Sequence, residues 1–340
     1  MQFEKLFIPT SNDFAPFVWR FIVVWEIALV AIVLFAVWKR EVSPLTSTDP
    51  LALYPETTAQ ALRQSPSLSE LDLSYTPIAD LSPLWHRPLK KLKLHDCRGV
   101  TNFAVLSSLH SLKTLEVTNT NFARLTLLQQ LPLNGLMLEN CEKISFFAPL
   151  ADLHSLQELD LDCTTIKDLT CLSKLPLKKL TLRKCKNVLD FTPLAALKFL
   201  EELDLQETAI IDLAPLTGAP LKTLVLRGCK NIIDFTPLAQ LKSLEELDLE
   251  DTDIVDLGPL SFLPLRTLIL RGCTKIDDFG QLAGLKTLEE LDLQHTKITH
   301  LLCLSNLPLK RVVLPETARI TDLASLMHMK HLNIVNRRFR

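Results

Sequence analysis

The sequence repeats a short leucine pattern, LxxLxL, from Leu68 to near the end of the chain. The spacing between successive copies alternates between 21 and 23 residues without exception. A fixed period of this kind indicates a repeat architecture, here with a unit of 44 residues made of two unequal halves. The first leucines of the copies are Leu68, Leu89, Leu112, Leu133, Leu156, Leu177, Leu200, Leu221, Leu244, Leu265, Leu288, Leu309 and Leu332.

Each half begins with leucines at alternate positions, for example Leu224 and Leu226. This alternation predicts a short strand with one buried face. A Pro-Leu step such as Pro237–Leu238 follows, and the preceding Thr236 suits a helix N-cap with proline at the first helical position. One strand and one short helical segment cannot bury their own leucines, so the copies must stack into a solenoid with a continuous leucine core.

The repeats resemble the leucine-rich repeat family over about residues 68–340. Halves of the form LxxLxLxxT-x-I-x-DL-x-PL are similar to the short bacterial, internalin-like class, and LxxLxLxxC-x-x-I-x-DF halves are similar to cysteine-type repeats. Two departures are threonine in place of the usual asparagine in alternate halves and the lack of a cysteine-rich cap. The resemblance implies an α/β solenoid of twelve repeats and a partial thirteenth, with a parallel concave sheet, short helical or 3-10 convex segments, and a role in protein binding.

An apolar segment precedes the repeats. It reaches the roughly 20 residues that a bilayer core needs, and it is longer than the apolar part of a signal peptide. No small-residue cleavage site follows it, so we expect an uncleaved single-span anchor. The predicted organisation is a tail (1–16), a transmembrane helix (17–38), a linker (39–56), a capping helix (57–67) and the repeat solenoid (68–340).

The charges around this segment bear on its orientation and contacts. Lys39 and Arg40 directly follow the span and favour a cytoplasmic repeat domain, although Lys5 and Arg20 precede it in equal number. Glu26 lies inside the span, where a carboxylate is costly and usually faces another polar group. Two interpretations stay open: Glu26 and Arg20 contact a partner helix in the membrane, or Glu26 lies near enough to the interface to reach water or stay protonated.

The strands alternate in charge while their leucines stay constant. Glu202 and Asp204 belong to an acidic strand, whereas Lys179 and Thr181 belong to the preceding basic or neutral one. Neighbouring parallel strands lie ~4.8 Å apart, so this interleaving separates like charges and permits pairs between strands. We prefer this structural explanation to a dedicated recognition code, because rows of charge usually form solvated faces.

The C-terminal half of the concave face is the predicted partner-binding surface. Apolar residues occupy strand positions there that a polar residue would also suit, and they interleave with aspartates and arginines. Such mixed patches are typical of interfaces, although β-propensity explains the apolar residues about as well. The predicted partner-binding residues are Asp204, Val225, Asp248, Ile269, Asp292, Val313, Arg227 and Arg271.

Five of the eight cysteines recur every 44 residues, namely Cys97, Cys141, Cys185, Cys229 and Cys273. Successive members stand two strands apart, ~9.6 Å, which exceeds the ~7 Å that a disulfide allows between Cα atoms. We expect buried free thiols and no metal site. A second recurring set is predicted to cap the backbone rather than to act as general acids, namely Asp190, Asp212, Asp234, Asp256 and Asp278.

No candidate catalytic residue departs from the period, and the chain contains no phosphate-binding glycine motif. The sequence therefore predicts no enzyme activity and no cofactor. A net charge of -2 and the absence of interleaved basic and aromatic residues argue against nucleic acid as a partner.

These observations together predict a single-pass membrane protein, in contact with lipid through residues 17–38, whose solenoid binds protein partners. The expected role is an accessory or assembly subunit of a membrane complex. The alternative is a single-pass receptor whose solenoid senses a soluble or surface ligand. A stoichiometric membrane partner would favour the first role, and ligand binding by the solenoid alone would favour the second.

Overall fold

The computed structural model describes residues 54, 56–315 and 320–335, all within the compact unit Pro50–Arg340. The predicted transmembrane helix (17–38), with Glu26 and Arg20, lies outside the described residues. Among the described residues, no helix combines the length and the apolar character that crossing a membrane requires.

Within the described residues, thirteen short strands form one parallel sheet, in which each strand pairs with its neighbours in the chain. Equivalent strand leucines align: Leu203 lies opposite Leu224, and Leu224 lies opposite Leu247. The parallel sheet that the family resemblance implied is therefore confirmed. The strands are β1 (Glu70–Asp72), β2 (Lys91–Lys93), β3 (Thr114–Glu116), β4 (Gly135–Met137), β5 (Glu158–Asp160), β6 (Lys179–Thr181), β7 (Glu202–Asp204), β8 (Thr223–Val225), β9 (Glu246–Asp248), β10 (Thr267–Ile269), β11 (Glu290–Asp292), β12 (Arg311–Val313) and β13 (Asn333–Val335).

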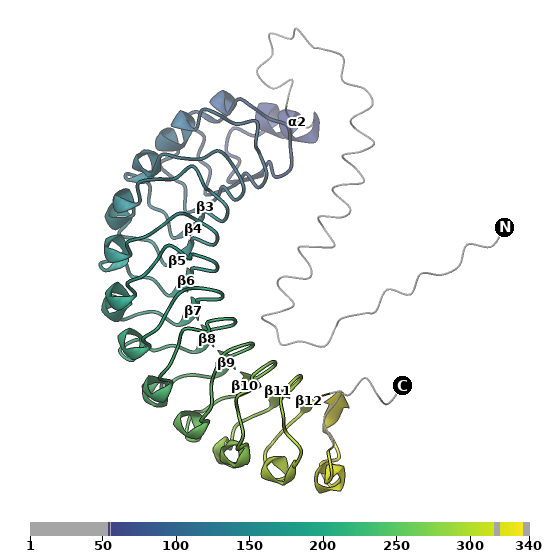
Figure 1. Ribbon diagram of the computed structural model, residues 1–340. Coiled ribbons are helices and arrows are strands. Elements are labelled where there is room, and N and C mark those ends of the chain that lie inside the picture. Colours follow the sequence, from purple (N-terminus) through teal and green to yellow (C-terminus); the bar gives the residue numbers. More distant parts are fainter. Residues whose placement is uncertain (1–53, 55, 316–319, 336–340) are drawn as a thin grey trace, which may run out of the picture. The chain divides into compact units, whose positions relative to one another are not determined.

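A short 3-10 helix follows each strand from β1 to β12. Figure 1 shows the strands along the inner side of an arc and the 3-10 helices along its outer side. The 3-10 helices are η1 (Ser82–Leu84), η2 (Ala104–Ser108), η3 (Leu125–Leu128), η4 (Ala148–Asp152), η5 (Thr170–Leu172), η6 (Thr192–Ala196), η7 (Ala214–Leu216), η8 (Thr236–Gln240), η9 (Gly258–Leu260), η10 (Gly280–Gly284), η11 (Leu302–Leu304) and η12 (Leu323–Leu326).

The alternating repeat length is taken up on this outer side. The 23-residue halves from η2 to η10 carry five-residue helices, such as η8, and the 21-residue halves carry shorter ones, such as η7 with three residues. The last 23-residue half carries η12, with four residues. The inner strands all have three residues and remain in register. Two unequal halves can therefore share one regular sheet, because the extra residues never enter it.

Aspartates cap the 3-10 helices η6 to η10, as predicted. The first helical N–H in each case donates to the aspartate two residues earlier, for example from Thr236 to Asp234 Oδ1 at 2.8 Å. Thr236 is itself the first residue of η8, and no side chain at the N-cap position bonds to the helix. The expectation that threonine is the N-cap was wrong, because the 3-10 helix starts one residue earlier than proline at its first position would require. The predicted capping aspartates are Asp190, Asp212, Asp234, Asp256 and Asp278.

The strand leucines form one continuous core that extends from Tyr54 to Leu326. Helix α2 (Glu56–Gln64) precedes the first strand and contributes Ala59 and Leu62 to this core. Burial of one such leucine side chain contributes about 2 kcal/mol, so each coil supplies stabilisation to its neighbours only when it is stacked on them.

A residue with left-handed backbone geometry follows the end of almost every strand. From Tyr75 to Gly272, the N–H of this residue donates to a carbonyl of the next coil, as Glu207 does to Arg227 at 2.8 Å. The hydrogen-bond ladder between coils therefore continues beyond the strand. These residues have φ between 54° and 71° and are Tyr75, Asp96, Asn119, Asn140, Cys163, Lys184, Glu207, Gly228, Asp251, Gly272 and His295.

Candidate functional site

The acidic residues at the ends of the inner strands bond to their own backbone. The Oδ1 atom of Asp204 accepts the N–H of Gln206 at 2.9 Å, and that of Asp248 accepts the N–H of Glu250 at 2.8 Å. Asp160 and Asp292 make the same bond with the residue two positions later. These carboxylates hold the turn after each strand, a function that the sequence analysis did not assign to them.

Four of the eight predicted partner-binding residues are buried, which corrects the expectation that all eight lie exposed on the concave face. Asp204, Val225, Asp292 and Val313 are each at most 7% exposed. The physical reason is that strands ~4.8 Å apart on the inner side of a curved sheet crowd the side chains of neighbouring rows. This crowding depends on the curvature, which a strand pattern alone does not specify.

The other four predicted residues retain accessible surface. Arg227 and Arg271 have side chains 45% and 38% exposed, and Asp248 and Ile269 are half-buried. Glu250 lies between the two arginines, 3.0 Å from Arg227 Nη2 and 3.7 Å from Arg271 Nε. The structure thus brings two guanidinium groups and one carboxylate together on this part of the inner face. Partner binding by these residues remains a prediction.

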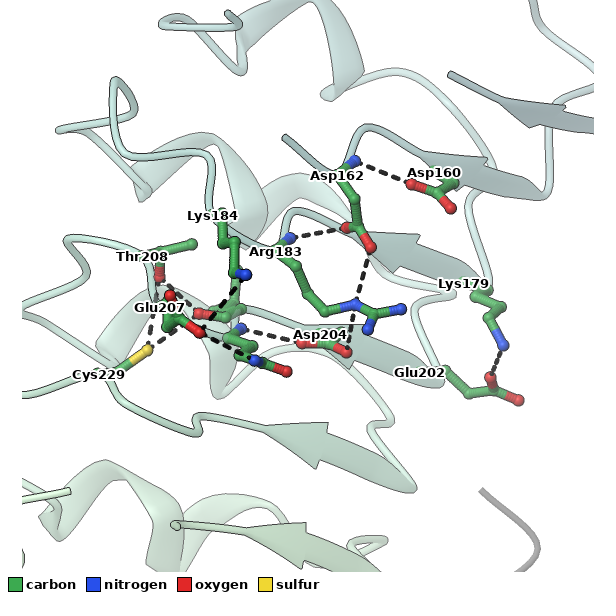
Figure 2. Close-up of polar contacts among 12 residues, drawn as sticks. Asp160, Asp162, Lys179, Arg183, Lys184, Glu202, Asp204, Glu207, Thr208 and Cys229 are labelled. Carbon is green, nitrogen blue, oxygen red and sulfur yellow. Dashed lines mark hydrogen bonds and ion pairs between the residues drawn. The ribbon is translucent and has the colours of Figure 1, made fainter. Parts of the chain in front are cut away.

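Ion pairs connect neighbouring coils on the inner face, as the charge alternation predicted. Arg183 Nε lies 2.7 Å from Asp162 Oδ2 and 3.3 Å from Asp204 Oδ2, so one guanidinium lies between two acidic coils (Figure 2). Lys179 Nζ lies 2.7 Å from Glu202 Oε2 beside it. The alternation of acidic and basic halves therefore allows ion pairs to form between neighbouring coils.

Burial raises the pKa of several inner carboxyl groups. The pKa of Asp160 rises to about 7, mainly through burial and also through the nearby Asp162 carboxylate. Burial raises the pKa of Asp248 to about 7, against the hydrogen bond from Glu250, and that of Asp204 to about 6. These aspartates therefore titrate near neutral pH, and the charge of the inner face changes with pH there.

A second charged cluster lies near the N-terminal end of the sheet. Glu116 accepts a 2.7 Å hydrogen bond from His95 Nε2 and lies 3.3 Å from both Lys91 Nζ and Lys93 Nζ. Burial alone would raise the pKa of Glu116, but the hydrogen bond with His95 and the charges of Lys93 and Lys91 lower it to about 2. The sequence analysis assigned no site here, although Lys91, Lys93 and His95 alternate along one strand face.

The five recurring cysteines are buried free thiols, as predicted. Cys229 donates to the Leu205 carbonyl in the preceding coil at 3.0 Å and lies 3.6 Å from the Thr208 hydroxyl. The other four make the same bond at 3.0–3.1 Å. Within the described ranges, no group of His, Cys, Asp or Glu side chains has the arrangement of a metal site.

A hollow of about 640 Å³ lies between two neighbouring coils, lined by the loops and 3-10 helices that follow β4 and β5. It contains a largely exposed aromatic ring, Phe146, together with the side chains of Lys167, Asp168 and Lys174. The sequence analysis did not anticipate this hollow, because it forms only where two loops of neighbouring coils meet. Within it, the Thr170 hydroxyl donates to Asp168 Oδ2 at 2.9 Å and the Thr170 N–H donates to Asp168 Oδ1 at 2.8 Å, so this pair caps η5.

No protein-family model matches the chain, and no curated protein matches it either. Solved structures do match. An internalin from Listeria monocytogenes, InlF, superposes with a TM-score of 0.65 and 25% identity, over 84% of this chain and 92% of its own. The fold is a leucine-rich-repeat solenoid.

Two further structures share this leucine-rich-repeat fold. Internalin C2 from Listeria monocytogenes has a TM-score of 0.51 and 24% identity, over 62% of this chain and all of its own. TLR13, solved as a TLR13–ssRNA13 complex, has a TM-score of 0.57 and 20% identity, over 80% of this chain and 47% of its own. At these identities the likeness shows the fold alone. The leucine-rich-repeat fold is typical of protein-binding scaffolds.

Proposed function

We propose that the chain is a protein-binding scaffold that is anchored in a membrane and acts as an accessory or assembly subunit of a membrane complex. The observation that carries the binding role is the charged surface formed by the partly exposed side chains of Arg227 and Arg271, which flank the buried Glu250. It lies on a rigid parallel sheet, and a fixed array of side chains loses little conformational entropy when it binds.

Membrane anchoring rests on the apolar segment 17–38 and on its length. Glu26, with Arg20 nearby, is the expected contact to a partner helix, because a carboxylate inside a span usually faces another polar group. Lys39 and Arg40 directly after the span favour a cytoplasmic solenoid.

The test is the mass of the native protein extracted in mild detergent, with mass spectrometry of the proteins that co-purify. We expect a large assembly with stoichiometric membrane proteins. A lone monomer would contradict the subunit role and would leave the single-pass receptor, whose solenoid should then bind a soluble ligand.

Two variants locate the contact within this experiment. Glu26→Gln should weaken the assembly if the span contacts a partner helix, and Arg227→Ala with Arg271→Ala should weaken it if the inner face does. Arg98→Ala is the matched control, because Arg98 is an exposed arginine that pairs with Asp96 beyond the end of β2.

A further inference from the structure

One loop position recurs at intervals of 22 residues along the solenoid. It follows the buried aliphatic residue of each loop and directly precedes, in most coils, the capping aspartate, as Ile211 lies between Ile210 and Asp212. We call this position the edge row. From the fourth coil to the eleventh its residues are Ser145, Lys167, Leu189, Ile211, Ile233, Val255, Asp277 and Thr299.

The four middle members of the edge row are aliphatic and exposed. Leu189 is 82% exposed, Ile211 56%, Ile233 87% and Val255 58%. The same position holds serine, lysine, aspartate or threonine in the flanking coils, so the fold does not require an apolar side chain there. The coils with a polar residue at this position fold in the same way, so folding does not explain the four consecutive exposed aliphatic residues. Contiguous exposed apolar surface is typical of an interaction site.

Equivalent loop positions of neighbouring coils lie side by side. Lys275 Nζ contacts Asp253 Oδ2 at 2.8 Å, and these residues stand two positions before Asp277 and Val255 in adjacent coils. In the next pair of coils, Lys297 Nζ, two positions before the edge row, lies 3.8 Å from Oδ1 of the edge-row residue Asp277 in the preceding coil. The four aliphatic residues thus form one continuous strip across four coils rather than four isolated groups.

A line of carboxylates accompanies the aliphatic strip. Each aliphatic residue is followed by a capping aspartate, and the cap hydrogen bond holds that carboxylate in place at 2.8–2.9 Å. Hydrogen bonds from the side chains of Thr192 and Thr236, together with these backbone bonds, lower the pKa of Asp190 and Asp234, so both remain ionised. The same loops carry Lys186 and Lys230, which the carboxylates outnumber. The members of this line are Asp190, Asp212, Asp234 and Asp256.

We propose that this edge strip, formed by Leu189, Ile211, Ile233 and Val255 with the four following aspartates, is a second docking surface for a partner protein. Its occupant is a polypeptide segment that carries aliphatic side chains flanked by lysine or arginine. The proposal rests on the proposed function only in that the chain binds proteins, since the strip lies outside the inner sheet face.

Charge complementarity selects this occupant over two others. A second copy of the chain that presents the same strip would bring carboxylates against carboxylates, which is unfavourable in a desolvated interface. An anionic bilayer surface would be repelled by the same carboxylates. A basic and aliphatic segment satisfies both the apolar line and the acidic line at once.

The test uses the full chain in phosphatidylcholine nanodiscs, with the signal of empty nanodiscs subtracted. The probes are two fluorescent 15-residue peptides, one of alternating leucine and lysine and one of alternating leucine and glutamate. Fluorescence anisotropy should show at least tenfold tighter binding of the leucine–lysine peptide, with a strong dependence on salt.

Two sets of variants separate the apolar and the acidic contributions. The first variant combines Leu189→Ser, Ile211→Thr, Ile233→Ser and Val255→Thr, which are residue types that the edge row already holds in other coils. It should weaken binding of the leucine–lysine peptide at least tenfold. Asp190→Asn, Asp212→Asn, Asp234→Asn and Asp256→Asn together keep an acceptor for the cap hydrogen bonds. This variant should bind the leucine–lysine peptide more weakly, and its binding should depend less on salt. Phe262→Ser is the control, because Phe262 is 88% exposed outside the strip and should have no effect.

Several results would overturn the proposal. These are equal affinity for the two peptides, unchanged binding by the serine–threonine variant, a dimer that this variant disperses, and binding of phosphatidylglycerol vesicles through the strip. A native complex that survives the strip variants but is lost in Arg227→Ala with Arg271→Ala would refute the strip and leave the proposed function intact. Loss of the complex in strip variants alone would support the strip.

Discussion

The Nε atom of Arg183 lies 2.7 Å from the Oδ2 atom of Asp162, whose side chain is almost fully buried. The backbone N–H of Arg183 donates to the other carboxylate oxygen of the same residue, also at 2.7 Å. One basic coil thus supplies both a charge and a hydrogen bond to the acidic coil before it. Removal of either partner from such a pair leaves a buried charge without compensation.

Arg183→Gln should therefore destabilise the solenoid, by about 2–4 kcal/mol at pH 8. The loss should be smaller at pH 5, because the nearby Asp160, with a pKa of about 7, is then protonated. Denaturant titrations at both pH values measure it. Arg227→Gln is the control and should cost under about 1 kcal/mol, since its pair with Glu250 is more exposed. Equal losses for the two arginines would contradict this account.

Asp248 should make the stability of the protein fall between pH 5 and pH 8. Its folded-state pKa, about 7, is raised above the value of an unfolded aspartate, near 4, so its stabilisation is present below about pH 4 and lost as the pH rises through about 7. Asp248→Asn keeps an acceptor for the Glu250 N–H and cannot ionise. The variant should lose roughly 1–2 kcal/mol less than the unmodified chain between these pH values.

Denaturant midpoints measured from pH 4 to pH 9 test this prediction. Asp234→Asn is the control, because the pKa of Asp234 is lowered and its charge does not change between pH 5 and pH 8. Parallel stability curves for the unmodified chain and Asp248→Asn would show that Asp248 does not titrate near neutral pH.

The five buried cysteines should resist alkylation in the folded protein. Burial raises the pKa of the Cys273 thiol to about 11 and also raises that of Cys229, so thiolate is scarce at pH 7. Treatment with N-ethylmaleimide should label only Cys163, Cys171 and Cys303, slowly, and all eight cysteines after unfolding in urea. Mass spectrometry counts the labels. Rapid labelling of Cys229 in the folded state would show that the row of buried cysteines becomes accessible to solvent.

At the left-handed turn position, replacing glycine by alanine and replacing a non-glycine residue by glycine should change the stability in opposite directions. Gly228 has φ of 68°, and an added Cβ would lie 3.1 Å from Glu207 Cγ, so Gly228→Ala should cost about 1 kcal/mol. Lys184 has φ of 58°, and Lys184→Gly should cost nothing or stabilise slightly, because it relieves backbone strain. Thermal midpoints of both variants check this, and a loss for Lys184→Gly as large as for Gly228→Ala would contradict it.

Most of the fold could be predicted from the sequence because the same local pattern of leucines and turn residues recurs in every repeat. Leu224 and Leu226 predicted a strand with one buried face, and both are fully buried. Cys229 and Asp234 had predictable local roles, since each depends only on contacts within its own coil and the preceding one. The threonine cap failed at Thr236 because the exact start of a 3-10 helix depends on which N–H the aspartate reaches.

The candidate site was less predictable. Asp204 and Val225 belong to the inner face by their strand position, but they are buried by neighbouring rows. The edge strip was readable in principle, since Ile211, Ile233 and Val255 recur at a constant spacing. The sequence did not show that these residues are exposed while their neighbours Ile210, Ile232 and Ile254 are buried.

The sequence by itself determined the solenoid, the strand positions, the inward cysteines and the aspartate caps, because each of these is a local interaction repeated with the period of the chain. Only the tertiary structure decided which side chains of a coil remain accessible, which carboxyl groups titrate near neutral pH, and which cation each acid meets. These properties depend on the curvature of the stack and on the distance between coils. Burial and electrostatic interaction are set by neighbours in space, and the pattern of one repeat does not contain them.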